Sequence, residues 1–260
     1  MDTPYKFTIA YDGRAYLGFQ EQPSGATVQS TLEAAFKKIL GEDVRVVPSG
    51  RTDSGVNAVA QVCHAIFHTK KACERLAKKD FILRINSVLP DDIAVTAATK
   101  SPGFHARKNA KGKTYEYLIL QSRTKNPFLE DKVWRVALPL DTAAMKRAAH
   151  HLIGRHDFSA FCASDSTVKD KTREIFDILI DRRSPAPFFK LPRESYVRLT
   201  FMGGGFLKQM VRNIVGTLVD VGLGKTTPER VKEILKSRDR RRAGPNAPAR
   251  GLYLRHVNYD

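Results

Sequence analysis

Segments with strand patterning and segments with helical spacing follow each other along this whole chain. Residues 4–11 alternate between apolar and polar side chains, and Val28 and Leu32 then begin a run at helical spacing. Thr27 and Gly41 suit the two ends of that helix, as an N-cap and a helix stop. The same patterns predict strands at 43–48, 58–68, 92–98, 113–121, 172–181, 194–202 and 251–259, and helices at 71–87, 141–153, 205–221 and from Thr227. There are more pairs of strands than a doubly wound fold would contain, so we expect an α+β fold.

A loop of different composition, residues 101–112, lies near the middle of the chain. Each side of it holds several predicted strands and two helices, and the second side also contains a Pro-rich loop at 184–192. A chain of 260 residues can form one large domain or two modest ones. We therefore expect an N-terminal α/β lobe at 1–103 and a C-terminal α/β lobe at 104–260.

The stretch Gly50-Arg51-Thr52-Asp53-Ser54-Gly55 places one carboxylate in a short polar turn between two glycines. Glycine allows positive φ and close backbone approach, so such a turn can hold a side chain against a ligand. Arg51 and Asp53 are two residues apart, so in an extended segment they point to the same face. The cation could then keep the carboxylate ionised. Asp and Gly are also ordinary turn residues, and these letters alone favour a simple turn.

The chain is strongly basic. Lys and Arg number 44 against 27 Asp and Glu, which gives a formal net charge of +17. An excess of this size indicates an anionic partner, with nucleic acid as the first candidate and an anionic membrane as the second. No apolar run approaches the ~18 residues of a membrane span, and the N-terminus shows no signal peptide. We therefore expect a cytoplasmic protein that binds nucleic acid and no membrane.

The cysteines and the missing motifs argue against metal and cofactor chemistry. Cys63, Cys73 and Cys162 are widely spaced and include no CxxC pair, so neither a disulfide framework nor a zinc site is predicted. Cys63 and His64 point to opposite faces of a strand, which predicts a core cysteine and a surface histidine. The chain also lacks a phosphate loop, a GxGxxG motif and a His/Glu metal motif. Any catalysis is therefore expected to need no metal and no cofactor.

Residues 104–117 combine four cations with two tyrosines of a predicted strand. The cations are Arg107, Lys108, Lys111 and Lys113. Tyr115 and Tyr117 follow on one face of the strand, and cations interleaved with aromatic rings suit a nucleic acid backbone with a base stacked on a ring. A solvated basic loop before a core strand explains the same letters equally well.

A predicted helix near residue 210 carries two further cations. Lys208 and Arg212 are four apart, on a different face from the apolar stripe that contains Met210 and Ile214. Together they could bind an anion or pair with a carboxylate, although a solvated polar face is the ordinary explanation. The basic, Gly/Pro-containing tail at 239–254 suits phosphate contact, or it forms a charged loop.

Together these stretches resemble the tRNA pseudouridine synthase A family, in the same order and over nearly the whole chain. The matching motifs are Tyr11-Asp12-Gly13, Tyr16-Leu17-Gly18-Phe19-Gln20, Thr27-Val28-Gln29, Gly50-Arg51-Thr52-Asp53-Ser54-Gly55-Val56, Phe104-His105-Ala106-Arg107, Tyr115-Glu116-Tyr117, Asp157-Phe158-Ser159-Ala160-Phe161, Met210-Val211-Arg212-Asn213-Ile214-Val215-Gly216 and Ala247-Pro248 to Leu254. The GRTD loop is specific to the family, and the ordered set is more specific still.

The resemblance implies a reaction, a fold and a partner. The reaction isomerises uridine to pseudouridine in the anticodon stem-loop of tRNA, at positions 38–40, without a cofactor. The pseudouridine synthase fold has two α/β lobes with antiparallel sheets joined around a central basic cleft. Family members are homodimers, so a homodimer that binds tRNA is expected here. Because the target uridine is paired or stacked, it must be flipped out, at a cost of a few kcal/mol.

The resemblance also assigns roles to individual residues. Asp53 matches the catalytic aspartate and would be the nucleophile, at the base or at the sugar. Tyr115 matches the tyrosine that packs on the target base, and Arg212 matches the basic residue that pairs with the aspartate. The residues expected to bind substrate are Arg51, Arg107, Lys111, Lys113, Tyr115 and Lys208.

Some positions depart from the family pattern. Asn57 stands where a histidine is usual, and Glu21 stands where a cation is common. Lys108 and Asn109 replace a usual Phe-Ser after the FHAR motif. We expect these changes to alter contacts within loops and with RNA, and not the chemistry.

Two other functions would suit a basic α+β protein. One is an RNA chaperone or assembly factor that keeps the fold without turnover, although Asp53, Tyr115 and Arg212 are all retained. The other is a metal-dependent nuclease, which would need clustered carboxylates. Two adjacent acidic pairs, Asp91-Asp92 and Glu130-Asp131, lie in turn-like sequence. A nuclease would be inhibited by EDTA, and a pseudouridine synthase would not.

Overall fold

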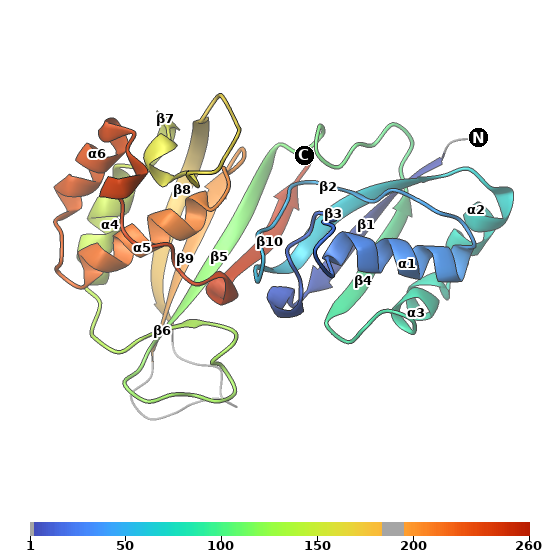
Figure 1. Ribbon diagram of the computed structural model, residues 1–260, viewed down its shortest axis with the longest axis horizontal. Coiled ribbons are helices and arrows are strands. Elements are labelled where there is room, and N and C mark those ends of the chain that lie inside the picture. Colours follow the sequence, from blue (N-terminus) through green and yellow to red (C-terminus); the bar gives the residue numbers. More distant parts are fainter. Residues whose placement is uncertain (1–2, 184–194) are drawn as a thin grey trace. The chain divides into compact units, whose positions relative to one another are not determined.

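The computed structural model describes residues 3–183 and 195–260. The chain forms two compact units, Met1–Lys111 together with Leu254–Asp260, and Gly112–Tyr253. We call these the first unit and the second unit. Both combine helices with a mostly antiparallel sheet (Figure 1), which confirms the predicted α+β class. The Pro-rich loop predicted at 184–192 lies outside the described residues.

The sheet of the first unit is built around its central strand β1. The strands are β1 (Thr3–Tyr11), β2 (Val47–Pro48), β3 (Asn57–Phe67), β4 (Ile93–Lys100) and β10 (Leu252–Asn258), in the order β4-β1-β3-β10 with β2 beside β3. β1 runs antiparallel to both β3 and β4, and Phe7 lies opposite Cys63 on one side and Ala98 on the other. The ring of Phe7 is fully buried between those of Phe36 and Phe67, at centroid distances of 4.9 and 6.2 Å. These aromatic contacts form the core beneath the helices.

Three helices belong to the first unit: α1 (Val28–Leu40), α2 (Lys70–Leu76) and α3 (Phe81–Asn86). The predicted limits of α1 are confirmed, because Thr27 and Ser30 form a reciprocal capping box and Gly41 follows in the left-handed conformation. The single helix predicted at 71–87 is wrong, since α2 and α3 are separate. Leu76 and Phe81 are both buried. Leu76 is the last residue of α2 and Phe81 the first of α3, so the break at 77–80 lies between two side chains of the core.

The sheet of the second unit has four strands in the main order and one short strand at its side. These are β5 (Gly112–Gln121), β6 (Trp134–Val136), β7 (Gly154–Asp157), β8 (Thr172–Arg183) and β9 (Ser195–Gly203), in the order β5-β9-β8-β7. Neighbours in that order are antiparallel, whereas β6 runs parallel to β5. Tyr117 on β5 and Phe201 on β9 are fully buried. The predictions for β5, β8 and β9 are confirmed within a few residues, while β6 and β7 were not predicted.

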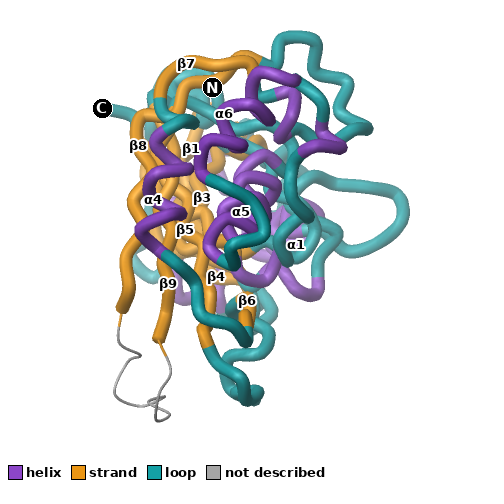
Figure 2. Tube along the Cα trace, turned by 90° about the vertical axis from the view of Figure 1, so that its left-hand side faces the viewer, coloured by secondary structure: helices purple, strands orange, loops and turns teal. Residues whose placement is uncertain are grey.

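The second unit also contains α4 (Thr142–His150), α5 (Met210–Gly222) and α6 (Pro228–Ser237), which Figure 2 shows beside the strands. Asp141 caps α4 and Thr227 caps α6, as predicted. The predicted start of α5 at 205 is wrong. Gln209 has a φ of 59°, so the regular helix begins only at Met210. Lys208 therefore lies outside the helix and does not stack on Arg212 at a four-residue spacing.

The tail at 239–251 packs directly on α5. A Cβ atom at Gly216 would lie 1.7 Å from the carbonyl oxygen of Pro245, so only glycine allows this approach. Arg240 donates to the carbonyl oxygens of Ala243 and Gly244 and to Oδ1 of Asn213. The guanidinium of Arg240 therefore stabilises the conformation of the tail. The tail is packed on α5, and not all of its cations face outward.

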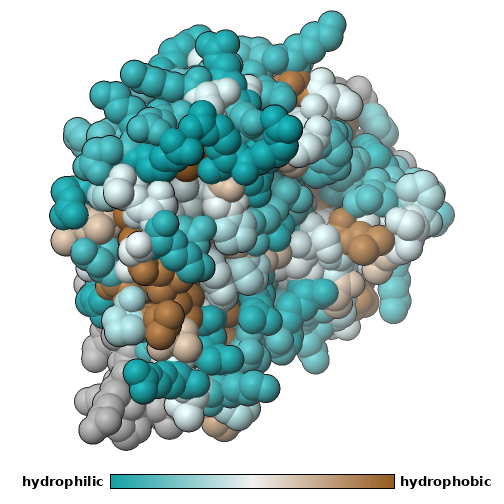
Figure 3. Space-filling model, turned by 60° about the vertical axis from the view of Figure 1, so that its left-hand side comes forward, coloured by the Kyte–Doolittle hydropathy of each residue, from teal (hydrophilic) through white to brown (hydrophobic). Residues whose placement is uncertain are grey.

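One face of the molecule is largely polar. Figure 3 shows a mostly hydrophilic face with a few separate hydrophobic patches. Within residues 3–183 and 195–260, no helix is long and apolar enough to cross a membrane.

The contact between Gly216 and Pro245 can be tested by adding one methyl group. An exposed Gly→Ala change inside a helix usually stabilises it by about 1 kcal/mol. Gly216→Ala is expected to lower the free energy of unfolding by about 1–3 kcal/mol instead, because the methyl group meets backbone atoms. Urea unfolding measures the change. Gly205→Ala, at a position outside the helix, is the control for adding a methyl group without a contact, since a Cβ there meets no atom within 4 Å. An unchanged or raised midpoint for Gly216→Ala would show that the tail does not press on α5.

Candidate active site

The loop that carries Asp53 connects β2 to β3 in the first unit. Asp53 is half-buried, and its backbone carbonyl accepts a hydrogen bond from Val56 N–H at 3.1 Å. This bond closes a tight turn in which Gly55 has a φ of 74°. The second glycine of the motif is therefore explained by the geometry of the turn. The carboxylate sits on a short, internally bonded segment.

A buried hydroxyl pair anchors the residue before Asp53. Thr52 is 7% exposed, and its Oγ1 lies 2.8 Å from the hydroxyl of Tyr11 on β1. The carbonyl oxygen of Thr52 also accepts from Phe19 N–H at 3.2 Å. Burial raises the pKa of Tyr11 to about 12, so its hydroxyl stays protonated at neutral pH. The side chain of Thr52 is thus held by β1, and its backbone is held by Phe19, in the segment that follows β1.

A second buried contact holds the residues after Asp53. A Cβ atom at Gly13 would lie 2.1 Å from the carbonyl oxygen of Val56, so the two loops meet backbone to backbone. Gly13 N–H donates to Oδ1 of Asn57 at 2.9 Å, and Asn57 is only 2% exposed. The amide of Asn57, which replaces the usual histidine, is therefore an internal acceptor for the neighbouring loop.

Ser54 links the loop, through Tyr16, to the residue that precedes β4. Its hydroxyl donates to the carbonyl oxygen of Tyr16 at 3.1 Å. The hydroxyl of Tyr16 donates in turn to Oδ1 of Asp92 at 2.5 Å. Burial, followed by the contact with Asp92, raises the pKa of Tyr16. The segment 12–19 thus braces the Asp53 loop from both ends.

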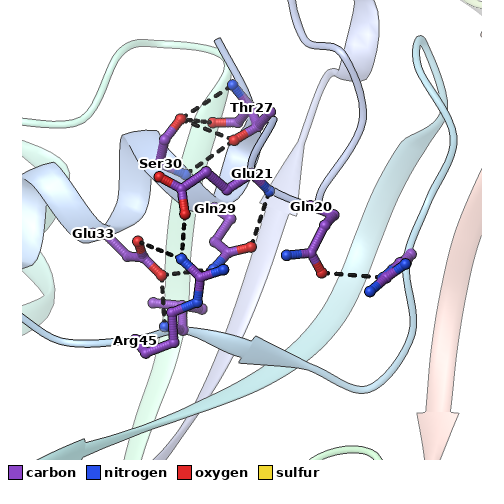
Figure 4. A network of polar contacts seen from close by, with 9 residues as sticks. Gln20, Glu21, Thr27, Gln29, Ser30, Glu33 and Arg45 are labelled. Carbon is purple, nitrogen blue, oxygen red and sulfur yellow. Dashed lines mark hydrogen bonds and ion pairs between the residues drawn. The ribbon is translucent and has the colours of Figure 1, made fainter. Parts of the chain in front are cut away.

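Arg51 is exposed at the start of this loop and contacts the segment before α1. Its Nε donates to Oε1 of Gln20 at 3.1 Å. Figure 4 shows that the next residue, Glu21, belongs to a polar network on α1, in which its backbone N–H donates to Gln29. The carboxylate of Glu21 forms an ion pair with Arg45. Glu21, which stands where a cation is common, is therefore paired with Arg45 of the same unit.

Two other candidate substrate-binding cations of the first unit lie on the loop after β4. Arg107 and Lys111 are both exposed, and Lys111 N–H donates to the carbonyl oxygen of Asn258 at 2.8 Å. His64, which we predicted at the surface, is 6% exposed and lies beneath this loop. The prediction failed because the loop covers the face of β3 that strand alternation leaves outside.

Tyr115 and Tyr117 occupy one face of β5, and both are buried. The ring of Tyr115 meets Phe206 edge to face, with centroids 5.3 Å apart and an interplanar angle of 86°. The hydroxyl of Tyr117 donates to the carbonyl oxygen of Pro248 at 2.7 Å, which ties β5 to the tail. Burial raises the pKa of Tyr117, against the smaller opposing effect of Arg212 and Arg250. Tyr117 is therefore a structural tyrosine. The sequence predicts Phe206 as part of the apolar stripe of a helix, but it lies before α5, is half-buried and orients Tyr115.

Arg212 lies in the first turn of α5 and is half-buried. Its Nε donates to the carbonyl oxygen of Ala247 at 2.7 Å, and Ala247 N–H donates back to the carbonyl oxygen of Arg212 at 3.2 Å. The tail thus fixes the guanidinium. Lys208 is exposed and forms a salt bridge with Asp165 at 2.6 Å, while Lys113 is half-buried at the start of β5.

The two units thus divide the predicted site residues. Asp53, Arg51, Arg107 and Lys111 belong to the first unit. Tyr115, Arg212, Lys113 and Lys208 belong to the second unit. The pairing of Asp53 with Arg212 stays a prediction. Among residues 3–183 and 195–260, no three His, Cys, Asp or Glu side chains are grouped so that they could hold a metal ion.

Comparison with known proteins identifies the family. The sequence profile of a family described as tRNA pseudouridine synthase matches residues 8–107 and 148–260. A tRNA pseudouridine synthase A from Pelobacter propionicus is 44% identical, over 98% of this chain and 98% of its own length. Proteins of the same name from Thermoanaerobacter sp. (strain X514) and Myxococcus xanthus are 42% and 41% identical, over 96% and 98% of this chain and 97% and 91% of theirs.

A solved structure of an archaeal box H/ACA sRNP complex is only distantly similar. It is 12% identical, with a TM-score of 0.30, over 92% of this chain and 59% of that chain. This likeness is too low to bear on the argument.

The hydrogen bond between Gly13 and Asn57 gives a test of how the loop is held. Asn57→Ala leaves a buried N–H without its acceptor, so we expect a loss of about 1–3 kcal/mol in the free energy of unfolding. Chemical denaturation measures it. Asn258→Ala is the control in the same unit, because Asn258 is exposed and should change stability by less than about 0.5 kcal/mol. Equal stabilities of the two variants would contradict the anchoring role.

Proposed function

The chain belongs to the tRNA pseudouridine synthase family, and we propose that Asp53 is the nucleophile with which it isomerises uridine to pseudouridine in tRNA. The observation that carries this proposal is the construction of the Asp53 loop. Its neighbours Thr52 and Val56 are held by buried contacts to Tyr11 and Gly13. Asp53 itself is half-buried. A carboxylate that reacts must be held in place before its substrate arrives, and this loop supplies that order.

The reaction exchanges one bond for another within a single nucleotide. The N1–C1′ glycosidic bond breaks, the uracil turns, and C5 bonds to C1′. N1 gains a proton and C5 loses one, so the product is an isomer of the substrate. The carboxylate of Asp53 forms a covalent bond, to the sugar or to the base, and is released when the new bond is complete.

Arg212 and Tyr115 complete the proposed active site. Arg212 pairs with Asp53 and favours its ionised form, as an adjacent cation does. Its hydrogen bonds with Ala247 support this role, because they orient the guanidinium before substrate binds. Tyr115 packs on the target base, supported by the edge-to-face contact that orients its ring against Phe206. Tyr115 also assists removal of the C5 proton.

The cations of both units bind the tRNA backbone. Those proposed are Arg51, Arg107, Lys111, Lys113 and Lys208, and the net charge of +17 supports them. We further propose that the target lies in the anticodon stem-loop, at positions 38–40, and that the enzyme acts as a cytoplasmic homodimer. The two sheets then join around a basic cleft that receives a flipped uridine.

Replacing the nucleophile tests the proposal. Asp53→Asn should lower turnover by about 10⁴-fold or more while leaving tRNA binding nearly unchanged, since the amide keeps the shape of the carboxylate but lacks its charge and its attacking oxygen. Tritium release from unmodified tRNA labelled at C5 of uridine measures turnover, and filter binding measures affinity. Asp43→Asn, at an exposed carboxylate of the same unit, is the control.

The outcomes separate the candidate functions. Release by the unaltered protein with none from Asp53→Asn supports the nucleophile. A parallel loss of binding and turnover would mean that Asp53 is structural. Binding of tRNA without release by the unaltered protein would favour an RNA chaperone instead.

Salt dependence tests the electrostatic part of the proposal. With about 6–10 phosphate contacts, tRNA affinity should fall roughly a thousandfold or more between about 50 and 200 mM salt. Replacing one phosphate-binding cation, as in Arg107→Ala, should lower the slope of log Kd against log salt by about one. An affinity that does not respond to salt would remove the electrostatic argument.

A further inference from the structure

Residues 104–109 form a compact turn in the first unit that presents two cations. His105 N–H donates to Oδ1 of Asn109 at 2.6 Å, and Asn109 N–H donates to the carbonyl oxygen of His105 at 3.0 Å. Arg107 and Lys108 lie between them and are both exposed. We call residues 104–109 the basic turn.

Two histidine rings lie beneath the basic turn and accept its backbone N–H groups. Nδ1 of the buried His64 accepts from Ala106 N–H at 3.2 Å. Nδ1 of His105 accepts from Arg107 N–H and from Lys108 N–H, both at 3.3 Å. The two ring centroids are only 4.6 Å apart. Three consecutive backbone N–H groups of the basic turn therefore depend on two imidazole nitrogens that carry no proton.

The C-terminal segment holds the turn from its other side. The hydroxyl of Tyr259 donates to the carbonyl oxygen of Ala106 at 2.8 Å. The rings of Tyr259 and Phe104 are 5.0 Å apart, and the ammonium of Lys6 lies 4.6 and 5.2 Å from them. The turn is thus fixed on both sides, and the two imidazole nitrogens are acceptors among these contacts that a bound proton would remove.

We propose that His64 and His105 are positioning residues, whose neutral imidazoles hold the basic turn in the form that presents Arg107 and Lys108 to tRNA. This rests on the proposed function, in which Arg107 contacts the tRNA backbone. Neither histidine contacts the reacting atoms. Each acts through the backbone of the turn.

The charges around the pair decide the direction of the pH effect. Lys6 on β1, and Arg107 and Lys108 on the turn, are cations on the elements packed around the rings, while Cys63 and Tyr259 are neutral at physiological pH. Protonation of either ring would add a further positive charge and convert its accepting nitrogen into a donor. Burial, and then His105, lower the pKa of His64.

The sign for stability follows from that shift. Because the pKa of His64 is lower in the folded protein than in the unfolded chain, its contribution is present above about pH 6.5 and declines as the pH falls below it. A basic protein normally binds RNA more tightly when its histidines gain charge. Here acidification should have the opposite effect, because the turn loses its acceptors.

Substituting each histidine by asparagine keeps a hydrogen-bond acceptor but removes the group that can be protonated. Oδ1 of asparagine stands at the same place along the side chain as Nδ1 of histidine, accepts a hydrogen bond, and does not titrate. His64→Asn and His105→Asn should therefore bind tRNA within about twofold of the unaltered protein at pH 7.5. His105→Ala, which lacks the acceptor, should raise Kd and KM about tenfold with little change in kcat. His68→Asn, at an exposed histidine of the same unit, is the control.

The pH profile is the decisive measurement. Between pH 7.5 and 5.5 we expect the Kd of the unaltered protein and of His68→Asn for tRNA to rise about tenfold, and that of the His64→Asn, His105→Asn double variant to rise less than twofold. A Kd that falls on acidification, or a profile that the double variant shares with the unaltered protein, would overturn the proposal. So would normal binding by His105→Ala.

Hydrogen exchange tests the turn in the absence of RNA. The amides of Ala106, Arg107 and Lys108 should lose protection relative to intrinsic rates between pH 7.5 and 5.5 in the unaltered protein, and keep it in the double variant. If these amides keep the same protection in the unaltered protein and in the double variant at both pH values, the positioning role of the histidines is overturned. If protection changes as expected but Arg107→Ala leaves tRNA affinity unchanged, the proposed contact of Arg107 with RNA is wrong, while the hydrogen bonds from the basic turn to His64 and His105 are supported.

Discussion

The first unit depends on one close approach between two pieces of backbone. The segment after β1 and the loop before β3 meet where Gly13 lies against Val56, with no room for a side chain between them. The hydrogen bond from Gly13 to Asn57 satisfies the amide that this approach buries. Asp53 lies four residues before Asn57, so the contact between Gly13 and Asn57 also limits the motion of the Asp53 loop. The carboxylate that we propose as the nucleophile is thereby held by the sheet behind its loop.

The second unit contains a similar close approach of backbone to backbone, here between the tail and a helix. The tail after α6 lies against α5 at Gly216, and the hydrogen bonds between Arg212 and Ala247 join the two in both directions. Arg240 is bound to carbonyl oxygens of that tail and to Asn213. Part of the positive charge of this chain therefore stabilises the fold, and the net charge overstates how many cations remain for RNA.

Local patterns were sufficient where local contacts determine the structure. Both ends of α1 and the starts of α4 and α6 follow from caps that are contiguous with their helices, so these were predictable, whereas α4 ends at His150 and not at the predicted 153. The break between α2 and α3 and the late start of α5 depend on which side chains the rest of the unit buries, and no local signal indicates them. His64 shows the same limit, since strand alternation placed it outside and a distant loop then covered it. The roles of Asp53, Tyr115 and Arg212 were assigned through a family resemblance. The contacts by which Asn57, Phe206 and Ala247 support them become visible only in three dimensions.

The path of the chain also bears on when the protein becomes competent during its synthesis. The first unit takes β10 and Tyr259 from a segment that follows the whole of the second unit in sequence. A ribosome therefore releases α1 and the Asp53 loop long before the residues that close the sheet beside β3 and secure the basic turn. Until then β3 has an open edge, which is a site for wrong pairing. The second unit, whose residues are contiguous, can fold before the first unit has its last strand, and the basic turn of the first unit is completed last.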